Sequence, residues 1–124
     1  MAKIHISDEL DRQAQAELAR DVRHAVVESL GLAPELGKVI VYSAPVQCRS
    51  VHSSRDPAFV LAEVLMFPGR DQEIKNRLYA RLNQVIKQHT GVDDANIFIN
   101  VIESPRGDWG IRGGRPASQV DLGY

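Results

Sequence analysis

One pattern occurs twice along this chain, and it limits the folds that the chain can adopt. Each copy consists of an apolar strand, an amphipathic helix, a glycine and a second apolar strand. Such self-similarity indicates a duplicated structural unit. We therefore expect two tandem β-α-β units, each with a crossover between parallel strands. The corresponding segments lie 58 to 60 positions apart: 4–6 with 64–66, Gly31 with Gly91, and 39–41 with 97–99.

The first unit begins with a short strand at 3–6, where polar and apolar residues alternate. Ser7 is typical of a helix N-cap, and acidic residues after it would complement the helix dipole. Gly31 is a typical helix end, and 38–42 is rich in β-branched residues, which predicts a buried strand. The helix is indicated by one apolar stripe: Leu10, Ala14, Leu18, Val22, Ala25, Val26 and Leu30.

The second unit follows a polar connection at 43–58, which we expect to be exposed. A strand is predicted at 59–67, then a Pro-Gly turn, a helix capped by Asp71 and ended by Gly91, and a strand at 96–102. The glycine-rich tail predicts turns and a short hairpin. The apolar stripe of this helix is Ile74, Leu78, Leu82, Val85 and Ile86.

These elements predict an α/β (α+β) fold: a four-stranded sheet with two helices on one face and a short C-terminal hairpin. A chain of 124 residues fits a single domain. We divide it into unit one (1–45), a connection (46–58), and unit two with the tail (59–124). The other sheet face would be bare in a monomer. Because strands 59–67 and 96–102 carry apolar residues on both faces, we expect self-association through it.

Composition excludes several classes of protein. The single cysteine, Cys48, rules out an intrachain disulfide and a multi-cysteine zinc site. A formal net charge of −1 does not favour a nucleic-acid partner. The longest apolar stretch is too short to cross a membrane, and no apolar signal segment opens the chain. We therefore expect a soluble, cytoplasmic protein with no nucleic-acid or membrane partner.

Several motifs of the second unit together resemble the tautomerase superfamily, whose smallest members are 4-oxalocrotonate tautomerases. The first is the strand-to-helix turn 68–75, Pro-Gly-Arg-Asp-Gln-Glu-Ile-Lys; the second is 96–103, Asn-Ile-Phe-Ile-Asn-Val-Ile-Glu. The third is the tail 109–114, Trp-Gly-Ile-Arg-Gly-Gly, with Ala117 and Ser118. The first unit matches more weakly, through 4–6 and 37–41. The doubled length is similar to fused members such as malonate semialdehyde decarboxylase.

The resemblance implies a trimer of fused chains and cofactor-free isomerase or lyase chemistry on a small 2-oxo or enol carboxylate. It implies no metal and no cofactor. A decarboxylase would also need an acidic residue after the first helix, where only Glu35 could serve. The alternative is a catalytically silent trimer, a binding or structural protein that kept the scaffold and lost the base.

The family's usual catalyst is an amino-terminal proline, exposed when the initiator methionine is removed. Here residue 2 is Ala. One register places Ala2 at the proline's position, and another leaves no residue there. If Met1 is removed, the primary amine of Ala2 is the candidate base, with an ordinary pKa of about 7.7–8.0. We expect tautomerase activity to be weak for this reason.

Four further residues are matched by the resemblance, each beside a plainer interpretation. Arg70 matches a carboxylate-binding position, and a guanidinium binds carboxylates bidentately; otherwise it is a solvated arginine at a helix start. Lys38 would assist it, or is a surface lysine at a strand end. Trp109 would wall the active site, or anchors the hairpin. Arg112 would bind an anion, or lies exposed at the hairpin tip.

Other reactive side chains in the sequence carry less information. Cys48 and His52 lie four apart in a predicted connection, where this spacing has no helical meaning, so we do not expect a catalytic pair. His5, His24 and His89 show no metal-ligand spacing. His24 and His89 are expected on helix surfaces.

Overall fold

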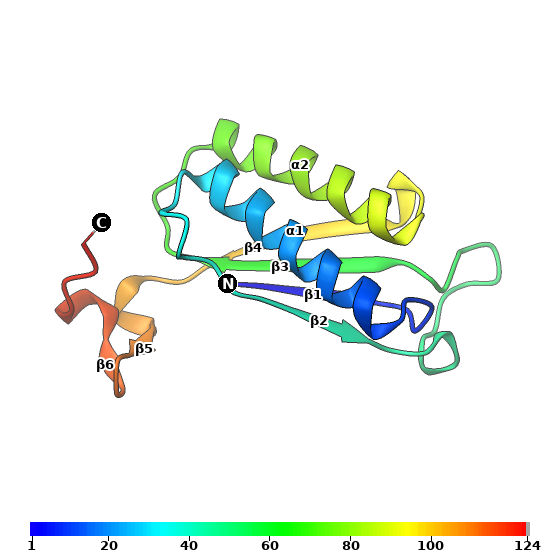
Figure 1. Cartoon of the computed structure of the whole chain (residues 1–124), viewed down its shortest axis with the longest axis horizontal. Helices are drawn as coiled ribbons and strands as arrows, with labels where there is room; N and C mark the ends of the chain where they lie inside the picture. The colour runs from blue at the N-terminus through cyan, green and yellow to red at the C-terminus, as the bar shows by residue number, and fades with distance from the viewer. Residues whose placement is uncertain (124) are drawn as a thin grey trace.

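The computed structural model describes residues 1–123 of the chain and contains two long helices, a main sheet and a small hairpin (Figure 1). Four single 3-10 turns, η1 to η4, connect these elements at Val46–Cys48, Asp94–Asn96, Arg106–Asp108 and Ala117–Gln119. The main elements are β1 (Ala2–Ile6), α1 (Arg12–Leu30), β2 (Val39–Ser43), β3 (Val60–Met66), α2 (Gln72–Thr90), β4 (Ile97–Glu103), β5 (Gly110–Ile111) and β6 (Arg115–Pro116).

The sheet has the strand order β2-β1-β3-β4 and confirms the two predicted β-α-β units. Within each unit the two strands are parallel, β1 with β2 and β3 with β4. The units join through the central pair β1 and β3, which run antiparallel with Ala2 opposite Val64. This pairing places the start of β1 beside the end of β3. The boundaries that we assign to the two units stay a prediction.

Each helix begins at an aspartate and ends at a glycine. The carboxylate of Asp71 accepts a hydrogen bond from the backbone N–H of Ile74 at 3.0 Å, as predicted. Asp11 does the same for Ala14 at 2.8 Å, so the prediction that Ser7 caps α1 is wrong. Residues 8–10 instead form a turn between β1 and α1, and Ser7 is buried after the strand. Gly31 and Gly91 end the helices in the left-handed conformation.

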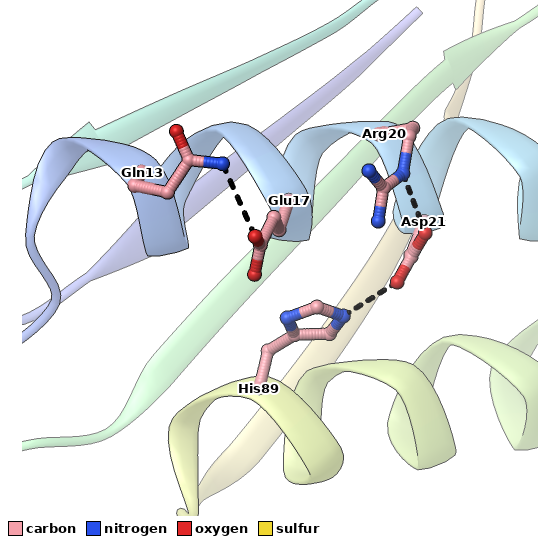
Figure 2. Close-up of polar contacts among 5 residues, drawn as sticks. All are labelled: Gln13, Glu17, Arg20, Asp21 and His89. Atoms are coloured by element: carbon pink, nitrogen blue, oxygen red, sulfur yellow. Dashed lines mark hydrogen bonds and ion pairs between the residues drawn. The ribbon is translucent and has the colours of Figure 1, made fainter.

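Both helices cover one face of the sheet and lie against each other (Figure 1). The predicted stripe residues Leu18, Val22, Leu78 and Leu82 are fully buried there. A polar contact also joins the helices. His89 Nε2 on α2 lies 2.8 Å from Asp21 Oδ2 on α1, and Figure 2 shows Arg20 on the other oxygen of this carboxylate. His89 is therefore a half-buried interhelical contact rather than the simple surface residue that we expected.

The opposite face of the sheet is not covered by any described element of the chain. β2 is an edge strand with only Val39 and Val41 turned toward the core, so its prediction as a buried strand is wrong. A β-branched sequence does not distinguish an edge strand from a central one. Ile40, Tyr42 and Phe98 are 46%, 43% and 54% exposed on strands β2 and β4.

The connection after β2 is mostly exposed, as predicted, but one arginine holds its ends together. Arg49 donates hydrogen bonds to the backbone carbonyls of Ala44 (3.1 Å), Pro57 (3.0 Å) and Phe59, and its guanidinium lies 4.7 Å from the Phe59 ring centroid. Cys48 lies exposed in the short turn η1. The tail forms the predicted hairpin, β5 with β6.

Candidate active site

A cavity of about 260 Å³ lies where β1 begins and β3 ends. The fold brings six segments to it: the chain start, the end of α1, the loop before β2, the end of β3, the hairpin and the tail. The wall is mostly apolar. It is formed by Met1, Val26, Leu30, Leu32, Leu36, Gly37, Lys38, Val64, Leu65, Met66, Phe67, Arg70, Trp109, Ile111 and Leu122.

The amine of Met1 lies at this cavity. It donates a hydrogen bond to the Leu65 carbonyl at 3.0 Å, and the Leu65 N–H donates to the Met1 carbonyl at 2.8 Å. Burial, and secondly the positive charge of Arg70, lower the pKa of this amine below its ordinary value. Both effects disfavour the ammonium form, so the neutral amine, which can act as a base, is more populated near pH 7.

Ala2, the predicted candidate base, is not among the residues that line the cavity. Its backbone N–H donates to the Lys38 carbonyl at 2.8 Å, and its side chain is buried in the core. With Met1 in place, the nitrogen of Ala2 is an ordinary strand amide. The free amine of this chain therefore belongs to Met1, the residue that precedes Ala2.

Arg70 lies half-buried between the turn that ends β3 and the aspartate that caps α2. Gly69 takes φ +122 in this turn, a conformation that side chains other than glycine's rarely adopt. Arg70 makes no hydrogen bond or ion pair within the described part of the chain, and it lines the cavity. Its guanidinium therefore remains available for an anion.

Lys38 supplies a second positive charge to the same cavity. It precedes β2, and its side chain has no ion-pair partner among residues 1–123. The loop before it is fixed by Arg23, which donates to the Gly37 carbonyl at 3.1 Å and to the Pro34 carbonyl. The cavity thus combines two unpaired cations and an amine with an apolar wall.

Trp109 lines the cavity from the hairpin side. Its ring meets Phe67 edge to face, with 5.6 Å between the centroids, and its carbonyl accepts a bond from the Ala117 N–H at 2.8 Å. Neither Phe67 nor Leu122 was expected in the site. The Phe67 position follows from its place directly before the Pro-Gly turn, whereas no local signal places Leu122.

Arg112 does not line the cavity. It lies exposed in the hairpin turn with φ +45 and donates a hydrogen bond to the Asp121 carbonyl at 3.2 Å. The structure therefore brings three of the predicted side chains together, those of Arg70, Lys38 and Trp109, and leaves Arg112 outside. Within residues 1–123 no group of three or more His, Cys, Asp or Glu side chains is arranged to hold a metal ion.

The duplicated unit forms a second cavity at the equivalent position, and that cavity lacks the cations and the amine. A cavity of only about 10 Å³ is lined by Ser7, Leu10, Thr90 and Val92, together with Ile6, Glu9, Ala58 and Val60. Leu10 lies 60 positions before Arg70 and therefore occupies the equivalent place. The chain is also continuous before β3, whereas the first site has a free amine before β1. Only the first site has the charges that an anion needs.

A family model described as "Tautomerase enzyme" matches residues 43–112, more than half of the chain. The chain belongs to the tautomerase family. The match begins at the last residue of β2 and includes the connection, which the motif resemblance had left out. No match was found among curated proteins. No described helix is long and apolar enough to span a membrane.

Several solved tautomerase-superfamily structures share the fold. The wild-type Q0 fused 4-OT, a symmetric trimer, has 24% identity and a TM-score of 0.84, over 94% of this chain and 95% of that chain. The R7 fused 4-OT, an asymmetric trimer, has 20% identity and a TM-score of 0.87, over 99% and 98%. FG41 malonate semialdehyde decarboxylase, inhibited by 3-bromopropiolate, has 22% identity and a TM-score of 0.79, over 94% and 92%.

Proposed function

We propose that this tautomerase-family protein catalyses cofactor-free isomerase chemistry on a small 2-oxo or enol carboxylate. The observation that carries the proposal is the pair of unpaired cations, Arg70 and Lys38, in an apolar cavity that also holds an amine of lowered pKa. The carboxylate would bind the Arg70 guanidinium bidentately, and Lys38 would add charge from the start of β2.

The terminal amine is then the general base. In ketonisation it removes the hydroxyl proton of the enol, and the C=C bond becomes C–C as C=O forms. The resulting ammonium returns a proton to the substrate carbon C3, so that the amine is regenerated. A general base works best when its pKa is near the working pH, which the lowered pKa of the Met1 amine favours.

We expect this activity to be weak, because a primary amine replaces the family's secondary amine. Ala2→Pro tests the point when combined with intact-mass analysis. If Met1 is removed, the variant carries a terminal proline, and ketonisation of an enol pyruvate should accelerate. If Met1 is retained, the proline lacks the N–H that Ala2 donates to the Lys38 carbonyl, and stability should fall by about 1 kcal/mol.

Processed Ala2→Pro protein that shows no acceleration, while its fold is preserved, would contradict the isomerase proposal. It would favour the second candidate, a silent binding or structural trimer. The observation that favours this candidate is the hydrogen bond between the Met1 amine and the Leu65 carbonyl, because it engages the amine within the protein. Under both candidates we propose a homotrimer, as in the fused 4-OT trimers that share the fold.

A further inference from the structure

The Met1 amine has a defined place at the wall of the cavity. It donates a hydrogen bond to the Leu65 carbonyl at 3.0 Å, and the Leu65 N–H donates to the Met1 carbonyl at 2.8 Å. These two bonds continue the antiparallel pairing of β1 with β3 by one residue beyond Ala2 and Val64. The bond to the Leu65 carbonyl uses one proton of the amine, so a reaction at this nitrogen must leave that proton in place to keep the carbonyl paired.

The surroundings of this amine favour an anion formed at the nitrogen itself. Arg70 and Lys38 line the same cavity, and within residues 1–123 neither side chain has an ion-pair partner. The charge of Arg70 reaches the amine, since it contributes to the lowered pKa of that group after the larger effect of burial. The same two effects leave more of the amine neutral, which is the nucleophilic form.

Two kinds of carbon electrophile react reversibly with a primary amine, and the site distinguishes between them. An aldehyde or ketone gives an imine. A neutral imine nitrogen carries no proton for the Leu65 carbonyl, and a protonated imine places a further positive charge beside Arg70 and Lys38. Carbon dioxide gives a carbamate, whose nitrogen keeps one proton and whose carboxylate is negative. Only the carbamate therefore satisfies both the carbonyl and the two cations.

We propose that Met1 is a modification site whose amine reversibly binds carbon dioxide as a carbamate, with Arg70 and Lys38 as partners of the new carboxylate. The nitrogen lone pair attacks the carbon of carbon dioxide, an N–C bond forms, and one C=O electron pair moves to oxygen. The nitrogen then releases one proton to water and keeps the other for the Leu65 carbonyl. The reaction needs no further reactant, and it does not depend on the proposed isomerase activity.

The modification has a consequence for the chemistry of the cavity. In a carbamate the nitrogen lone pair is delocalised into the carboxylate, so the nitrogen is no longer a base. The new carboxylate also occupies the two cations that an incoming anion would need. Carbon dioxide would therefore inhibit any reaction that uses this amine, and a small carboxylate and carbon dioxide would compete for the site.

The test uses protein whose intact mass includes Met1, in a solution of ¹³C-labelled bicarbonate, which equilibrates with carbon dioxide. We expect a ¹³C carbamate resonance separate from those of bicarbonate and carbon dioxide, and it should diminish as the pH falls and the amine is protonated. Trapping with a trialkyloxonium salt, followed by peptide mass spectrometry, should place the label on residue 1. A label found only as non-covalent bicarbonate, or attached only to lysine side chains, would overturn the proposal.

Variants test the part that the cations play. At the same concentration of carbon dioxide, Arg70→Ala should lower the carbamate fraction by about 10-fold, the loss of one charged hydrogen bond. Lys38→Gln should also lower it, which gives an independent measurement if the first variant folds poorly. Arg77→Ala is the control, because Arg77 lies exposed on α2 and pairs with Glu73. Carbamate fractions that are equal in all four proteins would refute the role of the two cations.

Discussion

The positive charge of Arg70 acts on the amine of Met1, and together with burial, the larger cause, it lowers the pKa of that amine. The two groups lie at the same end of the central strand pair. Arg70 follows β3, Met1 precedes β1, and the antiparallel register brings both to one cavity. A single residue thus has two expected roles, to bind the carboxylate and to keep the amine neutral.

Arg70→Ala should therefore shift the pH dependence of kcat/KM. Activity rises with pH as the amine loses its proton, and in the wild type this rise occurs at a lowered pKa. Without the guanidinium the amine's pKa returns toward its ordinary value, so the acidic limb of the profile should move to higher pH. Arg77→Ala is the matched control, because Arg77 lies exposed on α2 and pairs with Glu73. If the acidic limbs of the Arg70→Ala and wild-type profiles coincide, Arg70 does not lower the pKa of the base.

Gly37→Ala should be more damaging than a similar change at Gly91. Both glycines have positive φ, +83 and +70, so an alanine is strained at either by about 1–2 kcal/mol. Only at Gly37 would the added Cβ meet another side chain, lying 3.1 Å from Cγ2 of the half-buried Val27, which would have to move. We expect an extra loss of about 1 kcal/mol in the free energy of unfolding, measured by urea denaturation. If both variants lose the same free energy of unfolding, the loop before Lys38 adjusts to the added Cβ and the prediction is wrong.

The contact between His89 and Asp21 predicts a pH-dependent part of stability. The hydrogen bond from His89, then that from Arg20, lowers the pKa of Asp21 (Figure 2). A carboxyl whose pKa is lower in the folded state stabilises the fold above its unfolded pKa, about 3.9, and this contribution disappears as the pH falls through the lowered value.

Asp21→Asn should consequently lower Tm at pH 7 by a few degrees at most, about 1–4 °C, because the pair is partly exposed. The difference from wild type should close in strong acid. Glu17→Gln, one turn earlier on α1 and hydrogen-bonded to Gln13 (Figure 2), is the control. A Tm difference that persists below the lowered pKa of Asp21 would mean that the charge of Asp21 does not stabilise the fold.

The exposed sheet face predicts self-association. Phe98 on β4 is 54% exposed, and its ring makes an edge-to-face contact with Phe59. Light scattering should give a trimer of about 41 kDa, three times the 13.8 kDa chain. Phe98→Glu should give monomers with an unchanged far-UV circular dichroism spectrum, whereas Gln84→Glu on the helical face should remain trimeric. A wild-type monomer at micromolar concentration would disprove the assembly.

How well the sequence predicts the structure depends on how far apart in the chain the residues behind each feature lie. The caps Asp71 and Gly91 and the two helical stripes are local patterns, and the structure confirms them, except that Leu10 lies in the turn before α1 and not in the helix. Ser7 failed as a cap because Asp11, four residues later, offers the same chemistry at the true start of α1. The edge position of β2 depends on strand order, which local composition does not encode.

The candidate site shows the same division. Arg70, Lys38 and Trp109 could be proposed because a family resemblance placed them. The places of the Met1 amine and Leu122 depend on contacts between distant segments. The same resemblance also placed Arg112 in the site, yet its hydrogen bond to the Asp121 carbonyl holds it at the hairpin turn. Only the folded chain distinguishes these cases.

The central claim is that Arg70 makes this cavity a carboxylate site, and calorimetric titration with 4-methyl-2-oxopentanoate measures it directly. We predict a Kd below about 1 mM for wild-type protein and for Arg77→Ala. Arg70→Ala should weaken binding by about 10- to 100-fold, the loss of one charged hydrogen-bonding group, with little change in Tm. Binding that is equal in Arg70→Ala and wild type, or absent from wild-type protein, would contradict the account.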